Sequence, residues 1–231
     1  MNYQIQNQEI ELILDDSVFI PSPHGSSALG SSVRINPGET VLDIGTGTGL
    51  LAIFAAKLGG KVTAVDIMPE AIELARKNAE KNNVAIDVFF GNLFSPVQGS
   101  IYDVIIANVP QENLSPDIIN SFSPEKVIGM HGGEKGNEIL LRVLYSAAAF
   151  MHKKSRLYVA VYSMSDFRTS LREITKRYHA ELLNFYTGPV KDFVYSDILY
   201  YESQMNKGNI SIYKQGNEYW ADLFVFELSL K

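Results

Sequence analysis

The stretch Val41–Leu51, VLDIGTGTGLL, decides the fold of this chain of 231 residues. It reads as a buried strand ending at Ile44, a turn with glycine at every second position, and a helix beginning near Gly49. Glycine at this spacing lets the backbone turn tightly and approach a ligand closely. Asp43 would repel a pyrophosphate, so the loop favours a ligand with a cationic group. A tight turn without any ligand is the alternative at this point.

Composition and charge narrow the class of protein. Hydrophobic content of 46% and charged content of 20% are ordinary for a globular protein. The net charge of −6 provides no general attraction for nucleic acid or an anionic membrane. The absence of cysteine excludes disulfides and thiolate chemistry, and the 4 histidines have no ligand spacing, so no metal site is expected. No signal peptide or membrane span is recognisable, which predicts a cytoplasmic protein.

From residue 39 onward, short apolar runs alternate with amphipathic segments. This alternation predicts an α/β fold of the Rossmann-like, doubly wound type, with a mostly parallel sheet covered by helices on both faces. The expected strands are 40–44, 61–65, 86–90, 102–107 and 156–162. The expected helices are 49–58, a helix from Pro69 to about 81, and 167–178. A further helix is expected before the last of these strands, with Leu140, Leu144, Ala147 and Met151 on one face. After Tyr178, segments 181–186 and 220–228 predict two antiparallel strands at the sheet edge.

Two segments lie outside this regular pattern. Residues 1–38 are predicted to form a hairpin, with strands near 10–14 and 18–20 and a turn at 15–17, followed by a loop that caps the ligand site. Residues 39–231 form the main domain in this division. An insertion rich in aromatic side chains, at about 187–219, separates the last two strands.

Polar side chains end four neighbouring predicted strands. Asp43, Asp66, Asn92 and Asn108 each lie at or just past the carboxyl end of a strand. Open α/β sheets bind ligands at that edge. Single polar residues at strand ends are common, but four in this order, together with the glycine loop, indicate a binding site.

Each of these groups suits one part of a single ligand. The glycine loop and Asp43 suit a polar tail with an ammonium group, and Asp66, about twenty residues further on, suits two ribose hydroxyls. Ile67 and Leu93 would flank a flat base whose exocyclic amine bonds Asn92. A ligand with an amino-acid tail, a ribose and an adenine is S-adenosylmethionine.

With these motifs, the chain resembles the class I S-adenosylmethionine-dependent methyltransferases. The resemblance covers residues 41–162 and rests on VLDIGTGTG, VTAVDIMPEAIELARKNAEKN, GNLF and YDVIIANVP in combination. It implies a seven-stranded sheet whose last two strands form an antiparallel hairpin. The predicted cofactor-binding residues are Asp43, Gly45, Thr46, Gly47, Gly49, Asp66, Ile67, Asn92, Leu93 and Asn108. The family more often has Asp at the position of Asn92.

A narrower resemblance concerns the HemK/PrmC-type glutamine methyltransferases. Asn108-Val-Pro-Gln111 is similar to their Asn-Pro-Pro-Tyr motif, the stretch 131–136 (HGGEKG) is similar to their Gly-Gly-x-x-Gly, and 19–23 (FIPSP) to their proline-containing loop. The resemblance implies that Asn108 and the Val109 carbonyl accept hydrogen bonds from a target N–H₂. The predicted catalytic residues are therefore Asn108, Val109 and Pro110. Their main contribution to the rate would be to place the acceptor nitrogen in line with the methyl group.

The motif departs from the family at two positions, which leaves several acceptors open. Val109 replaces a proline, and Gln111 replaces an aromatic residue whose stacking would contribute roughly 1–3 kcal/mol for a nucleobase. The sequence favours nitrogen methylation of a protein or small molecule. The alternatives are methylation of tRNA or another nucleobase, small-molecule O-methylation, and a catalytically silent cofactor-binding subunit. His24 and His131 are not favoured as bases, and the oligomeric state is not predicted.

Overall fold

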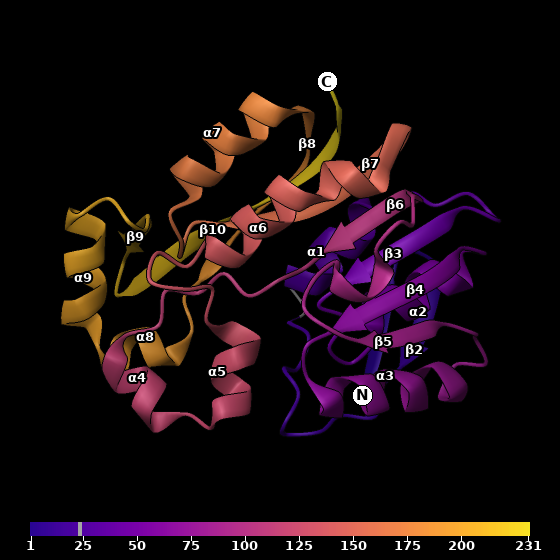
Figure 1. Cartoon of the computed structure of the whole chain (residues 1–231). Helices are drawn as coiled ribbons and strands as arrows, with labels where there is room; N and C mark the ends of the chain where they lie inside the picture. The colour runs from indigo at the N-terminus through magenta and orange to yellow at the C-terminus, as the bar shows by residue number, and fades with distance from the viewer. Residues whose placement is uncertain (23–24) are drawn as a thin grey trace.

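The computed structural model describes residues 1–22 and 25–231 of the chain (Figure 1). Pro23 and His24 lie outside the described residues. The end of the predicted proline-containing loop and the role of His24, which the sequence does not favour as a base, therefore fall outside the described part of the chain.

A central twisted sheet runs through the molecule in the order β5-β4-β3-β6-β7-β10-β8, with β9 paired to β10. The pairs β3–β4, β3–β6, β4–β5 and β6–β7 are parallel, while β10 is antiparallel to β7, β8 and β9. The predicted α/β fold with a final antiparallel pair is therefore confirmed. The strands of this sheet are β3 (Thr40–Ile44), β4 (Lys61–Asp66), β5 (Asp87–Phe90), β6 (Tyr102–Ala107), β7 (Met151–Tyr162), β8 (Tyr178–Pro189), β9 (Ile212–Gln215) and β10 (Glu218–Leu230).

Helices cover both faces of this sheet, as the apolar strand sequences require. One face packs against α1 (Gly25–Ser32), α2 (Leu50–Lys57) and α3 (Pro69–Lys81), whose buried side chains join those of the strands in one core cluster. The other face packs against η1 (Ser95–Val97), α6 (Glu138–Ser146), η2 (Ala147–Phe150) and α7 (Phe167–Arg177). Strands such as β3 and β6 are apolar on both sides because both sides are buried.

The predicted position of the N-terminal hairpin was wrong. The hairpin consists of β1 (Asn2–Ile5) and β2 (Gln8–Glu11), joined at Gln6, whose φ of 51° suits a tight turn. The turn after Asp15 exists, since the Val18 N–H donates to the Asp15 carbonyl at 3.0 Å, but no strands flank it. Ile10 pairs with Tyr3 within the hairpin. Beyond the hairpin, Leu12 lies in the core cluster that includes α2, and Val18 lines a cavity, so neither has a partner strand.

Two further expectations need correction. The serine-rich segment predicted as a loop contains the helix α1, because Leu29 is fully buried and Gly30 packs directly against Ile5. The helix predicted to carry Met151 on its apolar face ends at Ser146, followed by η2, and Met151 begins β7. Apolar spacing alone does not distinguish a helix end from the buried start of the next strand.

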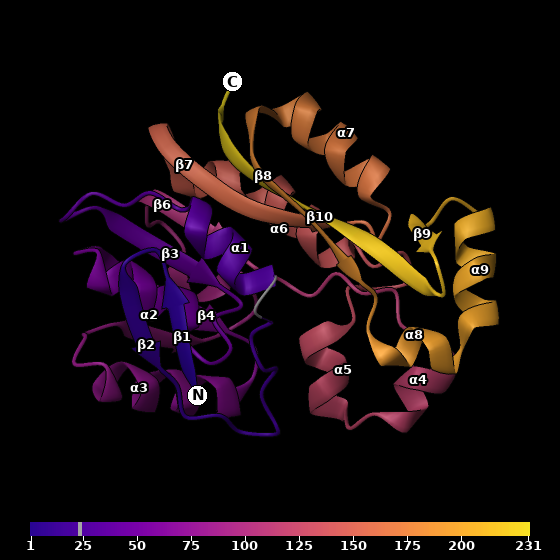
Figure 2. The same ribbon diagram turned by 180° about the vertical axis from the view of Figure 1, so that it is seen from behind.

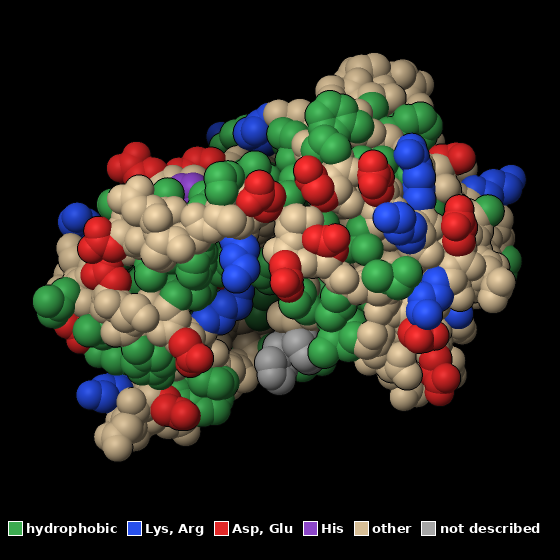
Figure 3. Space-filling view, turned by 90° about the horizontal axis from the view of Figure 1, so that it is seen from below, with side chains coloured by type: hydrophobic (Ala, Val, Ile, Leu, Met, Phe, Trp, Pro, Cys, Tyr) green, Lys and Arg blue, Asp and Glu red, His purple; other side chains and the backbone are tan. Residues whose placement is uncertain are grey.

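Helices that the sequence did not predict form a second part of the molecule. The helices α4 (Pro116–Ser121) and α5 (Pro124–Met130) follow β6, while α8 (Asp192–Ser196) and α9 (Ile198–Asn206) lie between β8 and β9. Figures 1 and 2 both show these four helices together, on the side of the molecule away from α2 and α3. Seen from below, the surface is hollowed between the two parts, with basic side chains on one wall and acidic ones opposite (Figure 3).

Candidate active site

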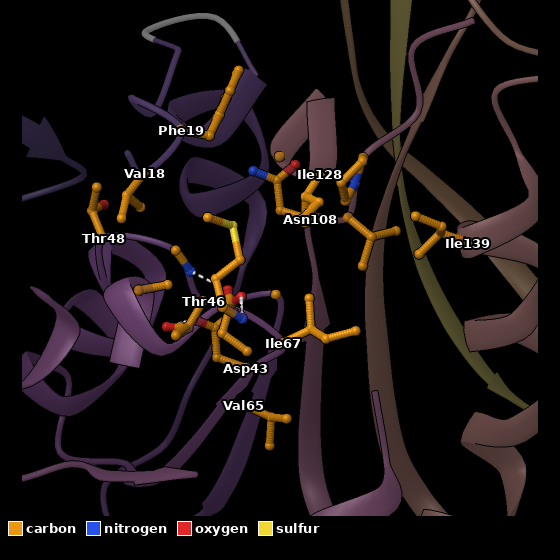
Figure 4. A pocket seen from close by; sticks show the side chains of 18 of the residues that line it. Val18, Phe19, Asp43, Thr46, Thr48, Val65, Ile67, Asn108, Ile128 and Ile139 are labelled. Atoms are coloured by element: carbon orange, nitrogen blue, oxygen red, sulfur yellow. Dashed lines mark hydrogen bonds between the residues drawn. The ribbon is translucent and has the colours of Figure 1, made fainter. Parts of the chain in front are cut away.

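The carboxyl ends of β3, β4, β5 and β6 meet at a cavity of about 380 Å³. Figure 4 shows Ile67, Asn108, Ile128 and Ile139 around the same space as Asp43 and Thr46. This convergence follows from the parallel topology, which brings the ends of neighbouring strands to one edge. The predicted site residues that line the cavity are Asp43, Gly45, Thr46, Gly47, Asp66, Ile67, Asn92, Leu93, Asn108, Val109 and Pro110.

The glycine loop adopts backbone conformations that residues with a Cβ atom rarely adopt. Gly45, Gly47 and Gly49 have φ values of 72°, 52° and 84°. Gly49 lies outside the cavity wall formed by the described residues, although it was predicted to bind cofactor. It precedes α2, and a Cβ there would lie 3.2 Å from the Cα of Ala75 in α3. Its role in the described structure is therefore to let α3 pack close to the loop.

Asp43 lies at the base of the cavity and is almost completely buried, with 1% of its surface exposed. Its Oδ2 accepts a hydrogen bond of 2.7 Å from the Thr46 hydroxyl. Burial raises the pKa of Asp43 to about 7, and the neighbouring Asp66 carboxylate acts in the same direction, while the Thr46 hydrogen bond opposes it. A cationic group in the cavity would stabilise the ionised form.

Asp66 ends β4, and its carboxylate holds two backbone segments, the glycine loop and the start of α3. The Gly47 N–H donates to its Oδ2 at 2.8 Å, and the Met68 N–H donates to its Oδ1 at 3.0 Å. Burial raises the pKa of Asp66, and these backbone donors oppose the rise. Each carboxylate oxygen retains a further lone pair. Beside it, Ile67 is 49% exposed and presents an apolar surface to the cavity.

At the far end of the cavity, Asn92 follows β5 and is exposed. Its Oδ1 accepts a hydrogen bond of 3.0 Å from the Arg142 guanidinium of α6. Arg142 also lines the cavity, and the sequence reasoning did not identify it. No local motif marks this arginine, because only the folded chain brings α6 within reach of the loop that follows β5.

Asn108 lies at the junction of this cavity with a second one. Its Nδ2 donates a 3.1 Å hydrogen bond to the hydroxyl of Ser26 in α1. Within the described residues, its Oδ1 accepts no hydrogen bond. The amide is therefore oriented by Ser26 with its oxygen left available.

The second cavity has a volume of about 300 Å³ and lies between α1, β7, β8 and β10. Its aromatic wall comes from Phe19, Tyr162 and Tyr186. The residues that line both cavities are Phe19, Ser26, Asn108, Val109, Pro110 and Gly129. A group seated in the second cavity therefore reaches the first one beside Asn108.

Gln111, which occupies the family's aromatic position, bonds the end of β7. Its Nε2 donates to the Ala160 carbonyl at 2.8 Å, and its Oε1 accepts from the Tyr162 N–H at 3.2 Å. Both polar ends of the side chain are thus used by backbone. Gln111 holds the motif against the sheet and offers no stacking surface.

The glycine stretch 132–136 supports the same motif. A Cβ on Gly132 would lie 2.0 Å from the Gly136 carbonyl oxygen, so the turn closes only without a side chain. The Gly132 N–H donates to the Glu112 carbonyl at 3.0 Å. His131 lines the first cavity, but its Nδ1 accepts the Leu114 N–H at 3.4 Å. The ring nitrogen that accepts this hydrogen bond is not free to take a proton from a methyl acceptor.

The wall that faces the strand ends comes from the N-terminal segment that the sequence analysis placed over the site and from a helix that it did not predict. Val18, Phe19 and Pro21 come from the segment before α1, and Ile128 from α5. The Ser-Pro pairs that begin α4 and α5 are helix-start signals, since Ser115 and Ser123 accept hydrogen bonds from the Ile118 and Lys126 N–H groups. These signals identify the helices but not the cavity they line.

Residues 1–22 and 25–231 contain neither a metal-binding cluster nor a membrane-spanning helix. Within these ranges, no group of three or more His, Cys, Asp or Glu side chains could hold a metal ion. Across the same part of the chain, no helix has the length and apolar character needed to cross a membrane.

The sheet order, the glycine loop and the cavity at the strand ends define a class I S-adenosylmethionine-dependent methyltransferase, whose methyl donor is S-adenosylmethionine. The chain belongs to the family described as ribosomal protein L11 methyltransferase (PrmA), whose model matches residues 28–150. The resemblance inferred from the motifs is thereby confirmed at the level of the class.

Individual relatives agree with this placement. A Methanocaldococcus jannaschii protein, provisionally named a protein N5-glutamine methyltransferase, is 34% identical over 172 residues, covering 74% of this chain and 85% of that protein. The ribosomal protein L11 methyltransferase of Pelotomaculum thermopropionicum is 47% identical over 94 residues, covering 39% of this chain and only 29% of that protein. The structure of a ribosomal protein L11 methylase from Lactobacillus delbrueckii subsp. bulgaricus has a TM-score of 0.57 at 19% identity, covering 94% and 84% of the two chains, and shows the shared fold.

Proposed function

We propose that this protein methylates a nitrogen of a protein side chain, with S-adenosylmethionine as methyl donor. One observation carries the proposal: Asn108 lies where the two cavities join, with its amide oriented by Ser26 and its oxygen available. A donor in the first cavity and an acceptor nitrogen in the second would meet at this residue.

The residues of the first cavity suit the cofactor. Asp43 would face the ammonium group of its amino-acid tail, beside Gly45 and Gly47, whose conformations let the backbone come close. Asp66 would accept the ribose hydroxyls, and the exposed face of Ile67 would lie against the adenine. The cavity of about 380 Å³ is within the usual range for a ligand of this size. Asn92, held by Arg142, would accept a hydrogen bond from the exocyclic amine of the adenine, and Leu93 would flank the ring together with Ile67.

Positioning is the main task left to the protein. When bound, S-adenosylmethionine would supply a methyl group activated by its sulfonium. The nitrogen lone pair would form the new N–C bond as the C–S bond breaks with its electrons left on sulfur, and the nitrogen would lose one proton to water. The Asn108 oxygen and the Val109 carbonyl would accept the N–H groups and turn the nitrogen lone pair toward the first cavity. Holding two reactants in line in this way contributes a large part of the rate enhancement. Pro110 would restrict the backbone that carries these two oxygens.

The relatives support a protein acceptor, since one is named for glutamine side chains and others for a ribosomal protein. A small-molecule acceptor is the second candidate, because the second cavity, at about 300 Å³, can hold a compact ligand. A nucleobase acceptor is less well supported, because Gln111 is hydrogen-bonded to β7 and provides no aromatic ring on which a base could stack.

The test uses cofactor labelled on its methyl group and a cell extract separated into protein, RNA and small-molecule fractions. We expect label in protein, on nitrogen. In Asn108→Ala, transfer should fall by roughly a hundredfold, the usual cost of misplacing a reactant, with cofactor affinity nearly unchanged. Asn209→Ala, which removes an amide outside both cavities, is the matched control and should transfer normally. Full activity of Asn108→Ala would contradict the proposed role of this residue.

A further inference from the structure

The second cavity carries an ion pair on its wall. The Lys191 ammonium, just after β8, donates to Oε1 of Glu112, which lies four residues beyond Asn108 in the chain. Glu112 is buried, with 7% of its surface exposed, whereas the Lys191 side chain is 37% exposed. Lys191 is therefore the member of the pair that remains open to a ligand.

The ammonium contacts one carboxylate and two aromatic rings, those of Phe19 and Phe193. Besides the Glu112 carboxylate, the Phe19 ring lies beneath it, with Nζ 4.9 Å from the ring centroid. Phe19 itself lines both cavities, so the ammonium lies near the passage between them. An ammonium has three N–H donors, and the only hydrogen bond that it makes among the described residues is to Glu112. The two ring faces contact it as a cation, the Phe193 centroid being more distant at 6.0 Å, so N–H donors remain for another partner.

A pair of this kind is a weak means of stabilising a fold. Withdrawing a carboxylate and an ammonium from water offsets much of their attraction. Burial raises the pKa of Glu112, and Lys191 opposes that rise, so the two charges depend on each other. A purely structural role does not require the lysine to face a cavity beside the predicted reaction centre.

We propose that Lys191 binds the carbonyl oxygen of a carboxamide acceptor in the second cavity, with Glu112 holding the ammonium in place; this inference rests on the proposed nitrogen methylation. A carboxamide presents N–H donors and a carbonyl acceptor on neighbouring atoms. Asn108 would accept from the nitrogen while Lys191 donates to the oxygen. Asn108 recognises any N–H donor, and Lys191 adds the requirement for the oxygen.

The charges of the pair explain why a carboxamide fits better than other groups. Because Glu112 neutralises most of the field of Lys191, the cavity favours a neutral oxygen over a carboxylate. A lysine side chain of an acceptor would bring a second ammonium close to Lys191 without offering an oxygen. Glutamine or asparagine side chains are therefore the expected acceptors, ahead of glutamate and lysine.

Three small probes test this selectivity in the full-length protein: N-acetylglutamine amide, N-acetylglutamate amide and Nα-acetyl-lysine amide. Each is measured as an inhibitor of labelled methyl transfer to the protein fraction. We expect the glutamine probe to inhibit best, and Lys191→Met to weaken its inhibition roughly tenfold or more, the usual effect of losing a hydrogen bond to a charged group. Cofactor affinity should stay at the wild-type value.

Two further variants separate recognition from folding. Glu112→Gln frees the charge of Lys191 and should shift the preference from the glutamine probe toward the glutamate probe, a change that a merely structural pair would not produce. The double variant with Glu112→Gln and Lys191→Met leaves no unpaired buried charge, so it should fold as the wild type does but lack selectivity. Lys126→Met is the matched control, since Lys126 also lies over a phenylalanine ring, that of Phe122, but lines neither cavity.

The outcomes distinguish this inference from the proposed function. If label enters protein nitrogen but Lys191→Met keeps the wild-type response to all three probes, the assignment of Lys191 is overturned while the proposed function stands. Wild-type preference for the lysine or glutamate probe, or for none of the three, overturns it as well. If label enters no protein nitrogen at all, the proposed function fails first.

Discussion

Replacement of the buried Asp43 by Asn should change how the stability of the cofactor-free protein depends on pH. The carboxyl lies under the glycine loop with 1% of its surface exposed, and burial raises its pKa from 3.8 to about 7. In the unfolded chain the group ionises near its ordinary value, so the unfolded state loses its proton first. The unfolding free energy of the wild type therefore falls as pH rises from about 4 to about 7.

The size of this effect follows from the two pKa values. A difference between 3.8 and about 7 corresponds to roughly 4 kcal/mol lost above the folded-state pKa, an order-of-magnitude figure. Asn has nearly the same shape and can still accept the Thr46 hydroxyl, but it carries no charge. Asp43→Asn should therefore be more stable than wild type at pH 8, by up to roughly 4 kcal/mol, and about equal to it at pH 3.5.

Urea unfolding of the cofactor-free proteins, followed by circular dichroism between pH 3.5 and pH 8, measures this difference. Asp103 is a control of opposite sign, because the Thr40 N–H and hydroxyl and His152 lower its pKa to about 2. Its carboxylate stabilises the fold above the unfolded-state pKa and loses this effect as pH falls toward 2, so Asp103→Asn should be destabilised at pH 8. A parallel pH profile for wild type and Asp43→Asn would refute the reasoning.

Two substitutions test the packing around the site. Gly49→Ala should lower the unfolding free energy, measured by urea unfolding, by about 1–3 kcal/mol, because φ is 84° and the new Cβ would press on Ala75. An unchanged unfolding free energy would show that α3 shifts to accommodate the added methyl group without cost. Gln111→Ala should lower it by about 1–3 kcal/mol, since two backbone groups at the end of β7 lose their partner. In Gln111→Tyr, thermal unfolding should show the same loss of stability, because tyrosine cannot replace both hydrogen bonds. Wild-type stability of this variant would contradict the structural role of Gln111.

Local sequence patterns were sufficient for much of the fold and for one half of the site. Apolar runs that must be buried on both sides, glycines at positions of positive φ, and polar residues at strand ends all act over a few neighbouring positions. They predicted β3 to β7 and the position of Asp43, Asp66 and Asn108 on one cavity. The N-terminal hairpin was misplaced because alternating apolar residues can face helices or a cavity as well as a partner strand.

The tertiary structure alone decided what surrounds Asn108. Ser26, Lys191 and Phe19 lie far from it in the sequence. Gln111, which stands where the HemK/PrmC-type motif has an aromatic residue, bonds β7. Such contacts depend on how α1, β8 and the motif after β6 pack together, and no short pattern encodes that packing. The sequence by itself therefore determined the class I fold and the cofactor edge, because parallel strands bring their ends together. Only the folded chain placed a second cavity, with its ion pair, on the acceptor side.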